Sequence, residues 1–237
     1  MNLAKKTFNM RTNILSLLFV FLLVACHSPQ IETSILEEAS IEGSTTQQEE
    51  LPYYSEATFM PQWFETDDTI PQDFHSIPDF TLVNQNGKEV TLQTYQGKIQ
   101  VVSFFFTTCP GICPKMASNM YLIQEEFIED DQVKLISFSV TPDYDTVSIL
   151  REYADRKGAL DGKWDLLTGD RSQIYNLGRN AYFIEEDLGI EKSVDDFIHT
   201  ENILLIDGDQ HIRGIYNGLN KASIMQLMAD VKTLEAV

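Results

Sequence analysis

Apolar side chains recur along most of the chain with periods that alternate between those of strands and those of helices. Near-continuous apolar runs at 99–106 and 133–140 are typical of strands covered on both faces. The stripe of an amphipathic helix follows the first run, at Ile112, Met116, Met120, Ile123 and Phe127. We therefore predict a central parallel strand that leads directly into a helix.

The other predicted elements continue this alternation. They are, in chain order, a hairpin of strands 80–83 and 89–92 around Asn86-Gly87, a helix from Val147 that ends at Gly158, a strand at 164–167, a helix opening at Asp170, a second hairpin of strands 203–206 and 212–216, and a last helix capped by Asn220. Asp145 or Thr146 is expected to cap the helix from Val147. This order predicts an α/β domain whose mixed sheet is flanked by helices and preceded by an N-terminal hairpin.

The first 25 residues have the features of an export signal. Lys5, Lys6 and Arg11 precede an apolar run at 14–25 that is too short to span a bilayer. The run ends in Leu23-Val24-Ala25-Cys26, which resembles a bacterial lipobox, in which Cys26 becomes the lipid-modified first residue. Ordinary cleavage after Ala25 is the alternative, although Leu23 fits the small-residue preference of that cleavage poorly. We expect a lipid-anchored protein on the extracytoplasmic face of the bacterial cell envelope.

Residues 26–70 are predicted to form an acidic linker. They contain no Lys or Arg but ten Glu and Asp residues, a composition typical of a solvated, self-repelling spacer. The stretch 51–70 also carries aromatic side chains and is a candidate for packing on the domain edge. Residues 71–237 have the size of one domain and are long enough to bury a substantial core.

The net charge of −19 restricts the partners of the chain. A protein this acidic is not expected to bind nucleic acid through its phosphates. The charge could favour a basic partner or simply keep the protein soluble.

Cys109 and Cys113 are the candidate metal-binding or redox-active residues, because the remaining cysteine, Cys26, belongs to the lipobox. Pro110 and Pro114 are tolerated only near the first turn of a helix, so both thiols should lie at a helix entrance, where the dipole favours thiolates. Sulfurs four residues apart can converge on one ion, and soft thiolates suit Cu(I). In an exported protein such a pair is either a disulfide or a metal site.

The motif at 106–116, Phe-Thr-Thr-Cys-Pro-Gly-Ile-Cys-Pro-Lys-Met, together with Asp-Phe-Ile-His-Thr at 196–200, resembles the Sco/SenC family of copper proteins. The resemblance extends from about residue 72 to the C-terminus. It implies a thioredoxin-like fold and a site for Cu(I) or Cu(II) made by two cysteines and one histidine. It also implies a role in assembling the dinuclear copper centre of cytochrome c oxidase. The partner would then be the copper-bearing subunit of the oxidase or another copper protein.

One departure from the family pattern concerns an Asp-Pro step after the second core strand. This chain has Thr141-Pro142 there, so no function of the family Asp is carried over. Asp143 and Asp145 are expected to do no more than begin the following helix.

Among the four histidines, His199 is the candidate third ligand. His27 lies beside the lipobox, His75 lies at the end of the linker, and His211 follows a polar turn and is most simply an exposed strand residue. On its spacing alone His199 is more simply a loop histidine. The cysteine motif reverses that preference.

Two function classes remain open. One is a copper-binding assembly factor, which is not an enzyme, and the other is an extracytoplasmic thiol-disulfide oxidoreductase that reduces partner cysteines through a redox-active Cys109–Cys113 pair. Thioredoxin-like oxidoreductases carry a cis-proline just before a late strand, opposite their cysteines. This chain has no proline after Pro142, and His199-Thr200 stands at that position. The absence of the proline favours the metal-binding function.

Overall fold

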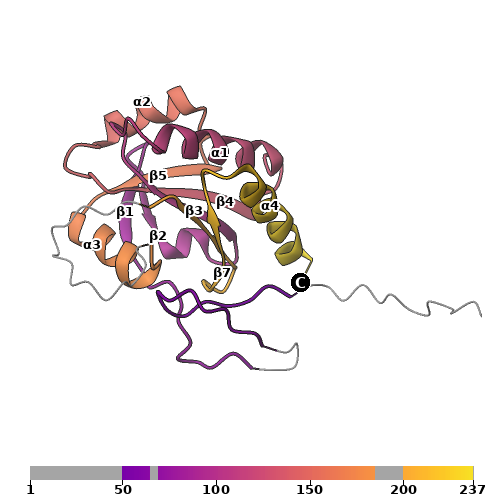
Figure 1. Ribbon diagram of the computed structural model, residues 1–237. Helices are drawn as coiled ribbons and strands as arrows, with labels where there is room; N and C mark the ends of the chain where they lie inside the picture. Colours follow the sequence, from indigo (N-terminus) through magenta and orange to yellow (C-terminus); the bar gives the residue numbers. More distant parts are fainter. Residues whose placement is uncertain (1–49, 65–68, 185–199, 237) are drawn as a thin grey trace, which may run out of the picture. The chain divides into compact units, whose positions relative to one another are not determined.

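The computed structural model describes residues 50–64, 69–184 and 200–236. Its elements are, in chain order, β1 (Thr81–Asn84), β2 (Glu89–Thr91), a 3₁₀ turn (Leu92–Tyr95), β3 (Ile99–Phe105), α1 (Cys113–Glu126), β4 (Val133–Ser139), α2 (Val147–Lys157), β5 (Trp164–Thr168), α3 (Arg171–Asn176), a π-helical turn (Leu177–Ala181), β6 (Asn202–Ile206), β7 (Ile212–Asn217) and α4 (Lys221–Glu235) (Figure 1). The predicted strands and helices all form. The 3₁₀ turn and the π-helical turn were not predicted.

All the named strands join one seven-stranded sheet in the order β2-β1-β5-β4-β3-β6-β7. The central strand β3 pairs in parallel with β4, as predicted, but antiparallel with β6. Ser103 lies opposite Ile203, and Gln100 lies opposite Ile206. The chain therefore enters β6 at the edge where β3 ends, which reverses the direction of β6 relative to β3.

The two faces of the sheet are both covered. Because side chains alternate along a strand, Val101 and Phe105 belong to one apolar cluster while Val102 and Phe104 belong to the other. The first cluster contains residues of α1, α2 and α4, and the second contains residues of α3 and of the chain before β1. The predicted α/β domain, with a mixed sheet flanked by helices, is confirmed.

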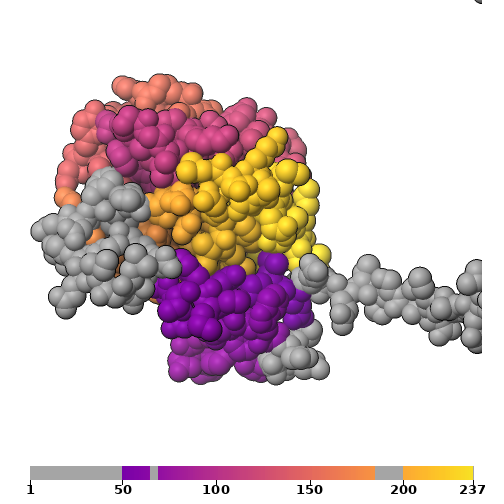
Figure 2. Space-filling model, in the orientation of Figure 1, coloured from indigo at the N-terminus to yellow at the C-terminus, as the bar shows by residue number. Residues whose placement is uncertain are grey.

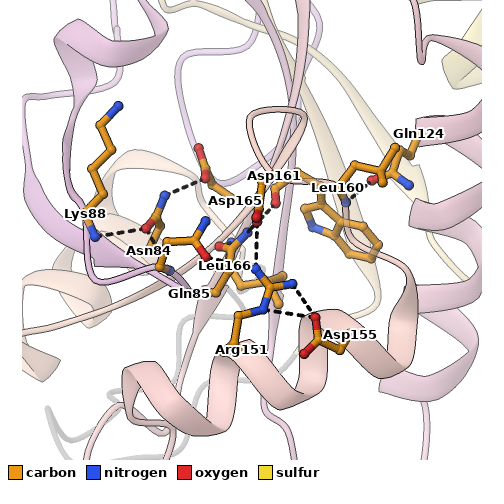
Figure 3. A network of polar contacts seen from close by, with 12 residues as sticks. Asn84, Gln85, Lys88, Gln124, Arg151, Asp155, Leu160, Asp161, Asp165 and Leu166 are labelled. Carbon is orange, nitrogen blue, oxygen red and sulfur yellow. Dashed lines mark hydrogen bonds and ion pairs between the residues drawn. The ribbon is translucent and has the colours of Figure 1, made fainter.

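The predicted N-terminal hairpin is also confirmed, and polar contacts attach it to the rest of the domain. β1 pairs antiparallel with both β2 and β5. Figure 3 shows Arg151 of α2 donating to Asp155 and Asp161, and Gln85 accepting the N–H of Leu166 in β5. Arg151 also donates to Asn86 in the hairpin turn at 2.9 Å. These bonds hold the hairpin turn against α2 and β5.

Residues 51–64, here called the N-terminal arm, pack against β7 (Figure 2). The Tyr54 N–H donates to the Ile212 carbonyl at 3.0 Å. The Arg213 guanidinium lies 3.7 Å from the centre of the Tyr53 ring and donates to the carbonyls of Leu51 and Pro52. The arm and the sheet belong to one compact unit.

The predicted signal peptide, residues 1–25, and the lipobox Cys26 lie outside the described residues. Within the described ranges, no helix is long and apolar enough to cross a membrane.

Candidate functional site

Cys109 and Cys113 lie just beyond the C-terminal end of β3. Helix α1 begins at Cys113, so Cys109 belongs to the loop before the helix rather than to its first turn. The loop turns back on itself, with the Cys109 N–H donating to the Phe106 carbonyl at 3.3 Å. The two sulfurs converge, as expected, and the Cys113 thiol donates a hydrogen bond to the Cys109 sulfur. This turn, and not the spacing along a helix, makes them converge.

The Cys109 sulfur is half-exposed and surrounded by donors. Burial raises the pKa of the Cys109 thiol, but the N–H groups of Cys113, Gly111 and Ile112 and the Cys113 thiol outweigh burial, so the pKa lies below its ordinary value. The predicted preference for thiolate at the helix entrance therefore applies to Cys109.

The Cys113 thiol is in a different environment. The residue is 5% exposed, and burial raises the pKa of its thiol to about 12, although the Phe106 N–H opposes this by donating to the sulfur. The thiolate of Cys109 beside it adds to the increase. The two thiols are free, and at neutral pH they differ strongly in their tendency to ionise.

An apolar cavity of about 320 Å³ opens beside the two sulfurs. It is lined by the end of β3 with Phe106, by residues 109–113, and by Val140 and Thr200. Thr200, which follows His199 in the sequence, is therefore part of the cavity wall. His199 itself lies outside the described residues, as does His27. Within the described ranges, no group of three or more His, Cys, Asp or Glu side chains could hold a metal ion.

The two described histidines lie far from the cysteines. His211 follows the turn after β6, whose end pairs with the beginning of β3, whereas the cysteines follow the end of β3. A strand of this length separates the two positions by about 20 Å. His211 is half-buried and is not the exposed strand residue that we predicted, because its Nδ1 bonds to the His75 carbonyl at 2.9 Å. His75 is therefore held at the same end, with Nε2 bonded to the Ala181 carbonyl.

Asp145 does not have the role predicted for it. Thr146, not Asp145, occupies the N-cap position of α2, and its side chain makes no capping bond. Asp145 is fully buried behind the cysteine loop and accepts hydrogen bonds from Thr107, Ser139 and Thr141. Asp143 is exposed and lies 3.8 Å from Arg171. The sequence signal that could have indicated this buried carboxylate is the pair of hydroxyl residues, Thr107 and Ser139, at the ends of two apolar strands.

Taken together, the fold and the site define a thioredoxin-like domain that carries a Cys-x-x-x-Cys pair at the end of its central strand. The family model described as SCO1/SenC matches residues 68–235. Because this match covers most of the chain, the chain belongs to the SCO1/SenC family.

Solved structures agree with this assignment and with the predicted thioredoxin-like fold. A SCO1/SenC family lipoprotein from Bacillus anthracis is 27% identical, with a TM-score of 0.60 over 68% of this chain and 95% of that one. BsSco is described as a member of the Sco family of cytochrome c oxidase assembly proteins with a disulfide switch. It is 30% identical, with a TM-score of 0.59 over 69% of this chain and 95% of that one. Bradyrhizobium japonicum ScoI, solved with copper bound, is 27% identical, with a TM-score of 0.54 over 68% of this chain and 99% of that one.

Proposed function

We propose that this protein binds one copper ion through Cys109, Cys113 and His199 and delivers copper to, or matures, the dinuclear copper centre of cytochrome c oxidase. The observation that carries the proposal is the convergence of the two sulfurs beside a cavity that the neighbour of His199 also lines. Copper is the cargo in this proposal. A recipient with stronger or additional ligands would take it by ligand exchange.

The chemistry of the donor set fits copper. Two thiolates are soft ligands that suit Cu(I), and an imidazole suits either oxidation state. Cys109 is held as the more acidic thiol by three N–H groups, so it can offer a thiolate to the metal first. Cys113 would lose its proton when the metal binds, since metal coordination favours the deprotonated ligand. The third ligand in this proposal is His199, which the resemblance to the Sco/SenC motif implies and whose neighbour Thr200 lines the cavity.

We also propose that Cys26 anchors the protein to a membrane through lipid. The lipobox motif supports this assignment, and a SCO1/SenC relative of similar fold is described as a lipoprotein. The acidic linker 26–70 would then place the domain at a distance from the membrane surface.

An extracytoplasmic thiol-disulfide oxidoreductase is the second candidate, and the difference between the two thiols favours it. An acidic, half-exposed Cys109 beside a buried, protonated Cys113 is an arrangement suited to attack on a disulfide. The sulfur of Cys113 could then resolve the mixed disulfide. This activity needs no imidazole at position 199.

Copper binding by the purified protein tests the ligand set. Cys109→Ser and Cys113→Ser should each abolish tight binding, and His199→Ala should weaken binding and change the Cu(II) absorption spectrum. His211→Ala is the matched control, since that ring lies at the other end of the sheet. An unchanged spectrum in His199→Ala would remove this histidine from the proposed site.

Oxidase activity in cells separates the two candidate functions. A strain with only His199→Ala keeps both thiols, so it should lose oxidase activity at low copper and regain part of it when copper is added. The His211→Ala strain should behave as wild type. Full activity of the His199→Ala strain at low copper, with loss only in the cysteine variants, would replace the copper donor with the oxidoreductase.

Lipid labelling tests the anchor. The wild-type protein should incorporate radiolabelled palmitate in its host, and Cys26→Ser should not. The Cys26→Ser protein should be released from membranes or remain unprocessed, while its purified domain binds copper as before. Failure of the wild-type protein to take up label would contradict the lipobox assignment.

A further inference from the structure

Asp145 is a buried carboxylate next to the cysteine loop, and hydroxyl and N–H groups hold it in place. Its Oδ2 accepts from the Ser139 hydroxyl at 2.6 Å, from the Thr141 hydroxyl at 2.9 Å and from the Thr107 N–H at 3.2 Å. Its Oδ1 accepts from the Thr107 hydroxyl. A fully buried carboxylate is tolerated only when such donors replace water, so its position is tightly determined.

Two of these bonds hold Thr107, at the point where the backbone leaves β3 toward the cysteines. Both the N–H and the hydroxyl of Thr107 donate to Asp145. The preceding N–H, that of Phe106, donates to the Cys113 sulfur, and the Phe106 carbonyl accepts the N–H of Cys109. Adjacent peptide groups thus connect the carboxylate to one sulfur and to the loop that carries the other.

We propose that Asp145 is a positioning residue for the Cys109–Cys113 pair. By holding Thr107 from two sides, it fixes the Phe106 N–H on the Cys113 sulfur and fixes the start of the loop whose N–H groups surround Cys109. It acts through Thr107, since its own described hydrogen bonds go to Thr107, Ser139 and Thr141. The proposal rests on the proposed function, because it concerns the same two sulfurs.

The expected consequence is a change in the balance between the dithiol and the disulfide. N–H groups that donate to the sulfurs stabilise the reduced pair, so loosening the loop should favour the disulfide. The equilibrium of metal-free protein with glutathione reports this directly. In that exchange the protein dithiol and glutathione disulfide form the protein disulfide and two glutathione thiols.

Thr107→Val and Thr141→Val form a matched pair for the test. Each removes one hydroxyl donor from the same carboxylate, and each residue is half-buried, but only Thr107 continues into the cysteine loop. Both variants should lose similar thermal stability. Thr107→Val should also move the glutathione equilibrium toward the disulfide by about tenfold, roughly 30 mV for a two-electron couple, whereas Thr141→Val should not move it.

Substitution of Asp145 itself provides the second arm. Asp145→Ala removes the acceptor and should give the same shift as Thr107→Val or a larger one. Asp145→Asn keeps an oxygen for the three donors at Oδ2, and its amide can donate to the Thr107 hydroxyl, which can accept instead. The conservative variant should therefore restore most of the wild-type equilibrium. If Asp145→Ala does not fold, the pair of threonine variants still gives an answer.

Copper spectra of the same variants separate this proposal from the proposed function. Thr107→Val should alter the Cu(II)–thiolate absorption, and Thr141→Val should leave it as in wild type. If the two threonine variants change the glutathione equilibrium and the copper spectrum equally, or if neither changes them, Asp145 has only a structural role. A wild-type protein that binds no copper would instead contradict the proposed function and leave the glutathione result interpretable.

Discussion

The two thiols of the site are chemically unlike although only three residues separate them. Three N–H groups and the Cys113 thiol surround the Cys109 sulfur, whereas Cys113 is buried under the loop. The sequence predicted thiolate character for both positions from the unpaired N–H groups and the dipole of a helix entrance. Burial, which the dipole argument does not include, reverses the outcome at Cys113.

Alkylation of the reduced, metal-free protein should separate the two thiols. Only thiolates react, and the pKa of Cys109 is lowered, so Cys109 should react with iodoacetamide at pH values below the ordinary thiol range of about 8.5. Cys113, with a pKa of about 12, should stay unmodified at neutral pH. Peptide mapping after timed alkylation from pH 5 to 9 measures both rates. Preferential labelling of Cys113 would contradict the assignment.

Two buried tyrosines allow a comparison of a core hydroxyl that has a hydrogen-bond partner with one that has none among the described residues. Among the described residues, the Tyr182 hydroxyl is fully buried with no hydrogen-bond partner, whereas the Tyr175 hydroxyl donates to the Val140 carbonyl at 3.0 Å. Tyr182→Phe should leave the free energy of unfolding unchanged or raise it by about 1 kcal/mol, and Tyr175→Phe should lower it by about 1 kcal/mol. Urea unfolding of the two variants provides the comparison. A clear destabilisation by Tyr182→Phe would mean that its hydroxyl is satisfied.

At the scale of elements, periodicity predicted most of the fold. The stripe from Met116 to Phe127 is buried as expected, and the Asn220 side chain accepts the N–H groups of Ala222 and Ser223 at the start of α4. Asp170 caps α3 by accepting the N–H of Gln173. These features depend on side chains close in sequence, and local rules describe them well.

Features that depend on distant partners were not predictable from local patterns. The direction of β6 is set by the edge at which the chain returns to the sheet, and periodicity does not contain this information. The same holds for Asp145, whose hydrogen-bond donors include Thr107 and Ser139, from the ends of β3 and β4, rather than groups of the helix that follows it. The cysteine pair could be recognised as a candidate site because its residue types and spacing are visible in the sequence, whatever the conformation of the loop that carries them.

The N-terminal arm packs on the edge strand β7, and the sequence made the aromatic stretch 51–70 a candidate for packing on the domain edge. The N-terminal arm joins the domain through Arg213, whose side chain is 11% exposed and which also lies 3.1 Å from Asp207. Stacking of a desolvated guanidinium on an aromatic ring contributes about 2 kcal/mol. The domain predicted for residues 71–237 would expose this guanidinium and the face of β7 that Tyr54 contacts.

Truncation should measure the contribution of the arm. A protein that begins at Thr46 should have a free energy of unfolding about 2 kcal/mol higher than one that begins at Pro71, because only the longer protein keeps the Tyr53–Arg213 stack and the carbonyl acceptors at Leu51 and Pro52. Arg213→Lys keeps the charge beside Asp207 but loses the planar donors, so it should destabilise the longer protein more than the shorter one. Urea denaturation of all four proteins gives the coupling energy. Equal effects of Arg213→Lys in the longer and the shorter protein would show that the arm contributes nothing through this side chain. As a control, the rate of Cys109 alkylation should be the same in all four proteins, because Cys109 lies at the other end of the sheet.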